Sequence, residues 1–181
     1  MIKKFLALYR VPILASFTLA MVLTAVAVVK EPLTIASIII AALVGVFVLD
    51  LDYFIYAYFI EPETDFSKTL VAFVKHKDII NALQYIEYHK KEMGDRTLNS
   101  VVFQLVLVGA AIFGVSSSAS IFVKSLILAI YVNSIYRLLE LYIKDEFDEW
   151  FWALKTKPTK SKVLIYIFVL VGILVYCISI F

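Results

Sequence analysis

Cysteine, histidine and charge are all scarce in this chain of 181 residues. The single cysteine, Cys177, excludes an internal disulfide, and its apolar surroundings indicate helix packing. Charged residues make up 18% of the sequence, whereas a water-soluble domain of this length carries about a quarter. Hydrophobic residues make up 62%, and the mean hydropathy is +0.92. We therefore predict an all-α fold, a polytopic membrane helical bundle that hides most of its surface in lipid.

Several signatures of enzymes and of nucleic-acid-binding proteins are also missing. The sequence has no phosphate-binding glycine loop, no G-x-S-x-G elbow and no H-E-x-x-H pair. The two histidines, His76 and His89, lie among lysines in a polar segment, where a solvated side chain is the usual case. A net charge of +2 without an Lys/Arg-rich arm argues against a nucleic-acid partner. We expect no cofactor, with a divalent metal as the alternative, and the lipid bilayer as the partner.

Five apolar segments are long enough to cross a bilayer, which takes about 20 residues. The sequence predicts one membrane domain over 1–181, with spans at about 11–29, 33–60, 98–123, 125–143 and 163–181. A signal peptide is the alternative for the first span, because Lys3 and Lys4 precede it and Ala25-Val26-Ala27 could be a cleavage site. The remaining topology is the same in either case.

Lysine and arginine are concentrated on one side of the predicted spans, which orients them in the cell (inner) membrane. With the N-terminus in the cytoplasm and the C-terminus outside, only Lys30 and Lys124 fall on the external side. The cytoplasmic side then receives Lys3, Lys4, Arg10, Lys68, Lys75, Lys77, Lys90, Lys91, Arg96, Lys144, Lys155, Lys157, Lys160 and Lys162.

A cytoplasmic amphipathic hairpin is predicted over 64–94. Asp65 or Ser67 can cap a first short helix, and Asp78 can cap a second after the "KHKD" interruption. The hairpin is interpreted as a cover on the membrane surface or as a lid over a site at the inner face.

A further amphipathic helix is predicted over 144–155, directly after the fourth span. Its apolar positions recur at i, i+3, i+4 and i+7, which favours a helix lying in the membrane interface, with a partner-binding helix as the alternative. These membrane-interface residues are Phe147, Trp150, Phe151 and Leu154.

Two carboxylates, Asp50 and Asp52, lie in an almost wholly apolar stretch, where an ionised carboxylate is costly unless it is paired. In a continuous helix, residues two apart point in nearly opposite directions, so both can reach one cation only if the helix breaks. Arg137 is the only basic residue inside a span, and Glu140 follows it at i+3. The acids are therefore interpreted as part of a structural ion pair with Arg137 and Glu140, as metal ligands, or as solvated groups at the interface.

The segment from Val46 to Leu141 resembles the YdjM-like predicted membrane-bound metal-dependent hydrolases, whose small relatives are bacterial. The likeness is carried by D-L-D in a membrane helix, the amphipathic hairpin, "EYHKKEMGDRTLNSVVFQ" and a polar-studded helix. That family implies a D-x-D-H motif, a His-Ser or His-Asn early in a later span, and a further histidine with an acid in the last conserved helix.

Most of the ligands that this resemblance implies are replaced here. Asp50 and Asp52 match the two acids, and His89 matches a histidine of the connecting region. The resemblance therefore implies a member that has lost its metal centre, with Arg137 at the vacated charge position. The replaced or remaining positions are Tyr53, Asn99, Ser100, Gln104, Tyr131, Asn133 and Arg137.

Two functions follow as hypotheses. The first is a non-catalytic accessory or scaffold protein of the membrane, and no metal is expected. The alternative is a metal-dependent hydrolase or lipid-processing enzyme at the inner face, with Asp50, Asp52, His89 and Asp95 as catalytic or metal-ligating candidates. A transporter is disfavoured, because the sequence has no repeated halves and no helices broken by glycine or proline in the usual way.

Overall fold

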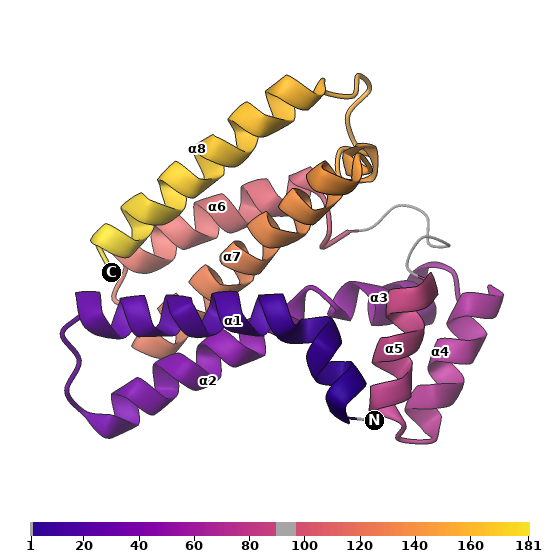
Figure 1. Cartoon of the computed structure of the whole chain (residues 1–181), viewed down its shortest axis with the longest axis horizontal. Helices are drawn as coiled ribbons and strands as arrows, with labels where there is room; N and C mark the ends of the chain where they lie inside the picture. Colours follow the sequence, from indigo (N-terminus) through magenta and orange to yellow (C-terminus); the bar gives the residue numbers. More distant parts are fainter. Residues whose placement is uncertain (1, 90–96) are drawn as a thin grey trace.

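The computed structural model describes residues 2–89 and 97–181, with side chains from Tyr9 onward except that of Glu87. Within these ranges the fold is all-helical, as predicted, and no strand occurs (Figure 1). The elements in chain order are α1 (Ile2–Val26), α2 (Pro32–Val48), α3 (Leu51–Ile55), the π-helix η1 (Tyr56–Ile60), α4 (Asp65–Lys75), α5 (Ile79–His89), α6 (Val101–Ser116), α7 (Ile121–Lys144), the 3₁₀ turn η2 (Phe147–Glu149) and α8 (Lys160–Ser179).

Three helices of the described chain are long and apolar enough to cross a membrane. They are α1 over Tyr9–Val26, α7 and α8, and the bent pair formed by α2 and Leu51–Ile60 would make a fourth. The helix predicted over 98–123 is shorter than expected, because α6 ends at Ser116 and the side chain of Ser120 caps α7. Its 16 residues span about 24 Å, at 1.5 Å per residue.

Helix α7 lies at the centre of the bundle and packs against α1, α2, α6 and α8. The closest approach is to α2 at Gly45, where a Cβ would lie only 2.6 Å from the Ala129 Cβ and 3.1 Å from the Ile130 nitrogen. Glycine at this position lets the two helices meet backbone to backbone, as small residues do in membrane bundles. The buried side chains around this contact include Ile38, Ala42, Leu128, Tyr131 and Leu138.

Helix α1 packs into the bundle along most of its length. Leu19, Ala20 and Leu23 are buried, and the Ser16 hydroxyl accepts a hydrogen bond of 2.8 Å from Asn133 Nδ2 on α7. Pro12 lies inside the helix and removes one backbone donor, which is a common cause of a kink. In Figure 1 the N-terminal part of α1 turns away from the rest of the helix.

The second predicted span, 33–60, is interrupted at the two aspartates. After α2 the backbone tightens, with the Asp50 nitrogen bonded to the Phe47 oxygen, and the following segment is bent by 45° from α2. Then α3 widens into η1, whose last bond joins the Glu61 nitrogen to the Tyr56 oxygen. The break changes the directions in which Asp50 and Asp52 point relative to those in a continuous helix.

The hairpin predicted over 64–94 corresponds to α4 and α5, which lie beside each other at the same end of the molecule as α3 (Figure 1). Its first cap differs from the prediction, because Thr64 rather than Asp65 or Ser67 is the N-cap and accepts from the Ser67 nitrogen at 3.3 Å. Asp78 does cap α5, accepting from the Asn81 nitrogen at 3.3 Å.

The helix predicted over 144–155 does not form. Helix α7 ends at Lys144, Asp145 takes a left-handed conformation with φ of 61°, and only the short turn η2 and bends follow. The physical reason is tertiary packing, since the aromatic side chains of this segment turn inward. Phe147, Trp150 and Phe151 are buried against the bundle, whereas Leu154 is 43% exposed.

Candidate functional site

Asp50 lies at the break after α2 and contacts two elements that are distant in the sequence. Its Oδ1 accepts from Arg137 Nη2 on α7, forming a salt bridge. Its Oδ2 accepts from the Tyr9 hydroxyl on α1 at 2.6 Å. Asp50 is 4% exposed, so the carboxylate has exchanged water for one guanidinium and one phenol.

Asp52, two residues further, faces the segment that leads into α6. Its Oδ1 accepts from the Thr97 backbone nitrogen at 3.1 Å, and its Oδ2 accepts from the Asn99 backbone nitrogen at 3.0 Å. The Asn99 Nδ2 donates to the same Oδ2 at 3.0 Å. These donors from the described part of the chain are all neutral, and they fix the start of α6 against α3.

Asn99 connects the two carboxylates. Its Oδ1 accepts from Arg137 Nη1 at 3.3 Å, and its Nδ2 donates to the Leu49 oxygen at 3.1 Å as well as to Asp52. One amide therefore bridges the guanidinium on α7, the backbone at the helix break and the second acid. We call Tyr9, Asp50, Asp52, Asn99 and Arg137 the inner polar cluster.

The burial of this cluster requires that its polar groups be matched. Asp52 is 1% exposed and Asn99 3%, while the Arg137 side chain keeps 20% of its surface. All four oxygens of the two carboxylates accept at least one bond from another part of the chain. Such multiple hydrogen bonding is what makes buried charges tolerable.

The other predicted site residues lie elsewhere or outside the description. Glu140 forms its ion pair with Lys144, one turn along α7. His89 stacks on Tyr85 with ring centroids 4.2 Å apart, and its Nδ1 lies 3.0 Å from the Tyr85 oxygen. Asp95 lies outside the described residues. Within the described ranges, no three His, Cys, Asp or Glu side chains are grouped closely enough to hold a metal ion.

Other positions that the resemblance singles out are also buried. Tyr53 is 2% exposed and packs with Val46 and Ala57, and Asn133 bonds Ser16 and the Ala129 oxygen. Ser100 caps α6, accepting from the Phe103 nitrogen at 3.3 Å. Gln104 Oε1 accepts from the Trp150 indole at 3.1 Å. Asn133 and Gln104 therefore link elements of the bundle, whereas Ser100 caps its own helix.

Sequence reasoning missed three members of the arrangement. Tyr9 lies just before the first predicted span, Asn99 is expected only as a replaced ligand, and the Thr97 nitrogen is a backbone group. The pairing of charged residues at the same predicted depth, which indicates Arg137, does not indicate Tyr9, because Tyr9 is neutral and lies outside the predicted span. No sequence signal indicates a backbone donor.

No family model, curated protein or solved structure matches this chain. Its function is therefore inferred from the contacts of the described residues.

Proposed function

We propose that this protein is an integral membrane protein with a non-catalytic role, as an accessory or scaffold. The observation that carries the proposal is the occupation of every carboxylate oxygen of Asp50 and Asp52 by donors of the chain itself. The inner polar cluster thereby joins α1, α3, α7 and the start of α6. A group of side chains so engaged holds helices together and leaves no lone acid or base for a substrate.

A divalent metal is a poor fit to the same residues. A zinc or manganese site needs three or four converging ligands, usually carboxylate or imidazole. Here the Arg137 guanidinium already forms a salt bridge with the Asp50 carboxylate, and its positive charge would repel a metal cation. Of the other proposed ligands, His89 is engaged with Tyr85.

The arrangement in the membrane that we propose has five spans, with the N-terminus inside and the C-terminus outside. In Figure 1, the α1–α2 turn, the α6–α7 connection and the C-terminus lie toward one end, and the hairpin and the α7–α8 connection toward the other. Helix α6 is short for a span. Either the flanking residues, from Leu98 to Ser117, cross the membrane with it, or the bilayer is thinner around it. The packing of α1 supports a retained helix rather than a signal peptide.

Kinship with the YdjM-like hydrolases is part of the proposal, as a divergent member without the metal centre. Asp50 and Asp52 would be the inherited acids. Arg137 would supply the positive charge that a metal ion provides in relatives, and Asn99 would replace a histidine while keeping a polar link between the acids.

The experiment that tests the proposal is elemental analysis of protein purified without chelator. We expect far less than one equivalent of transition metal, and a melting temperature that EDTA does not change, because removing a tightly bound ion would lower it. The matched control is an Asp50→Ala, Asp52→Ala double variant, which should show the same low metal content.

Stoichiometric metal in the wild type that disappears in the double variant would contradict the proposal. It would favour the alternative, a metal-dependent hydrolase or lipid-processing enzyme that works through Asp50 and Asp52 at the inner face.

A further inference from the structure

A pocket of about 310 Å³ lies between η1 and α4, outside the inner polar cluster. Its apolar lining, which we call the floor, is formed by Ala57, Pro62, Val71 and Ala72. Its polar lining comes from Tyr58 on η1 and from two lysines of α4, Lys68 and Lys75. A concave apolar surface with a few cationic groups is suited to a ligand that is part hydrocarbon and part anion.

The two lysines are placed to share one anion. They are seven residues apart on α4, so they lie on the same face about two turns, or roughly 10 Å, from each other. Lys68 Nζ contacts Glu63 Oε2 at 3.1 Å, but the two side chains are 59% and 91% exposed, and such surface pairs are weak. Lys75 has no ion-pair partner within the part of the chain that the structure describes.

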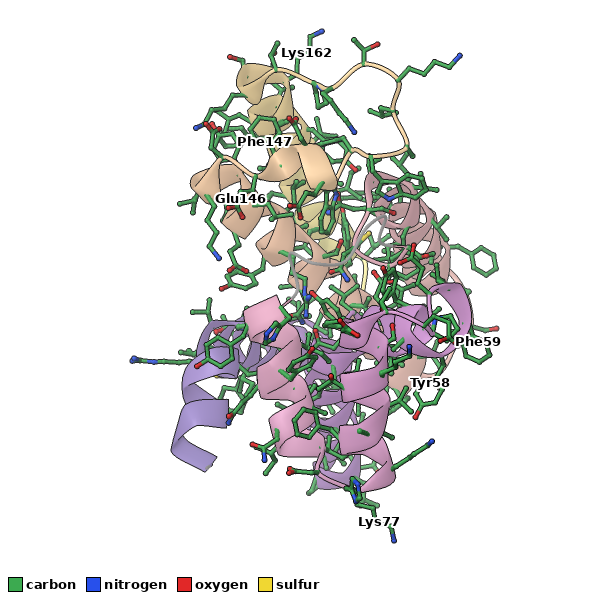
Figure 2. All side chains as sticks on the ribbon, turned by 90° about the vertical axis from the view of Figure 1, so that its right-hand side faces the viewer. Tyr58, Phe59, Lys77, Glu146, Phe147 and Lys162 are labelled. Atoms are coloured by element: carbon green, nitrogen blue, oxygen red, sulfur yellow. The ribbon has the colours of Figure 1, made fainter. Side chains whose placement is uncertain are left out.

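The surface beside the pocket is apolar where the bent second span ends in η1. Phe59 is 82% exposed, Ile60 47% and Tyr58 43%. Figure 2 shows Tyr58 and Phe59 pointing outward at one edge of the molecule. Exposed aromatic side chains at a helix end are typical of the bilayer interface, where the ring reaches lipid and the polar groups reach the headgroups.

We propose that this pocket binds the headgroup of an anionic phospholipid in the cytoplasmic leaflet. The phosphate lies between the ammonium groups of Lys68 and Lys75, and the glycerol and the first methylenes rest on the floor at Val71 and Ala72. The inference rests on the orientation given under the proposed function, which places α4 at the inner face. The negative charge of that leaflet favours lysines close to its surface.

The test is native mass spectrometry of the detergent-purified protein, titrated with phosphatidylglycerol or with phosphatidylcholine of the same acyl chains. The wild type should retain phosphatidylglycerol preferentially. A Lys68→Gln, Lys75→Gln variant should weaken that retention by roughly tenfold or more, because two cationic contacts are lost while a polar side chain remains at each position.

The matched control removes two lysines that lie outside the pocket, with Lys77→Gln and Lys162→Gln. Both residues are exposed, at the tip of the hairpin and near the start of α8 (Figure 2). This variant has the same net charge as the pocket variant and should retain phosphatidylglycerol within about twofold of the wild type. A further variant, Ala72→Leu, keeps both lysines and fills the floor, and it should also lose retention.

Three outcomes would overturn the inference. They are equal retention of the two lipids, equal loss in both lysine variants, and displacement of the lipid by an equal concentration of inorganic phosphate. The last outcome would identify free phosphate as the ligand. None of these results depends on metal content, so the failure of this inference can be distinguished from the failure of the proposed function.

Discussion

At the scale of single residues, Arg137 is the member of the inner polar cluster whose loss should be most costly. Its guanidinium contacts both Asp50 and Asn99. In an Arg137→Leu variant, the Asp50 carboxylate stays buried, and among the described residues the Tyr9 hydroxyl is the partner it keeps. We expect the free energy of unfolding to fall by about 3 kcal/mol, as for other broken buried pairs. Unfolding by SDS in mixed micelles measures the change.

A second substitution distinguishes the loss of the Arg137–Asp50 charge pair from the loss of packing by the Arg137 side chain. Adding Asp50→Asn to Arg137→Leu removes the unpaired charge, so the double variant should recover much of the lost stability. The control is Arg10→Leu, because Arg10 is exposed, and it should change stability by less than about 0.5 kcal/mol. Strictly additive effects of the Arg137 and Asp50 substitutions on the free energy of unfolding would show that the two side chains do not stabilise each other.

The contact between Arg137 and Asp50 lies within reach of sequence reasoning, but the rest of the cluster does not. A lone arginine in an apolar span requires an acidic partner, and Asp50 and Asp52 lie at a similar depth on another helix. Asn99 and Tyr9 are neutral, so nothing in the sequence requires them to have a charged partner. The bend after α2 decides whether Asp50 or Asp52 contacts Arg137. No proline or glycine lies at that bend to indicate it in the sequence.

At the scale of the elements, the contact between α2 and α7 depends on Gly45. Replacing it with alanine would place a Cβ 2.6 Å from the Ala129 Cβ, closer than packed atoms tolerate, with backbone of α7 directly behind. We expect Gly45→Ala to lower the free energy of unfolding by about 1–3 kcal/mol, as overpacking does.

Two other glycines provide matched controls for this substitution. A Cβ at Gly109 or Gly172 meets nothing within 4 Å. Because alanine is the better helix former, Gly109→Ala and Gly172→Ala should be neutral or stabilising by up to about 1 kcal/mol. Destabilisation of the same size at all three positions would show that the close approach of α2 and α7 is not the cause.

The segment after α7 offers a second element-scale prediction, because its two tryptophans are differently placed. Trp150 is 1% exposed and bonds Gln104, whereas Trp152 is 39% exposed. In a Trp152→Phe variant, the remaining Trp150 should be weakly quenched by acrylamide and by brominated lipid. In a Trp150→Phe variant, the remaining Trp152 should be quenched more strongly. Strong lipid quenching of Trp150 would restore the interfacial aromatic face that the sequence predicted.

The periodicity of this segment explains why sequence reasoning failed there. Positions i, i+3, i+4 and i+7 fit a helix, but the three aromatic side chains among them also suit a tight turn folded back onto a bundle. The Val101 nitrogen bonds the Trp150 oxygen, so a backbone contact distant in the sequence stabilises the turn. The hairpin, by contrast, depends on local caps and local periodicity, and both of its helices were predicted.

At the scale of the whole molecule, the all-helical fold follows from composition and apolar length. The number of spans is harder to derive, because α6 is short and the second span is bent. A hydropathy window averages over both features and cannot detect the local hydrogen bonds of Ser117 that follow the last turn of α6.

The orientation of the bundle in the membrane follows from the charges of its lysines and from the end of the bundle at which each lysine lies. Among the described residues, the basic side chains at the external end of our arrangement are those of Lys30 and Lys124. The Lys124 Nζ donates a hydrogen bond of 3.1 Å to the Val115 oxygen. Lysines accumulate at the other end, where membrane insertion retains them in the cytoplasm. Reporter fusions after Lys77 and Pro158 should therefore read cytoplasmic, and fusions after Ser117 and Phe181 external. An external reading at Lys77 would show that the second span runs in the opposite direction. The inner polar cluster would then lie at the outer face, and the pocket beside α4 could not bind a lipid of the cytoplasmic leaflet.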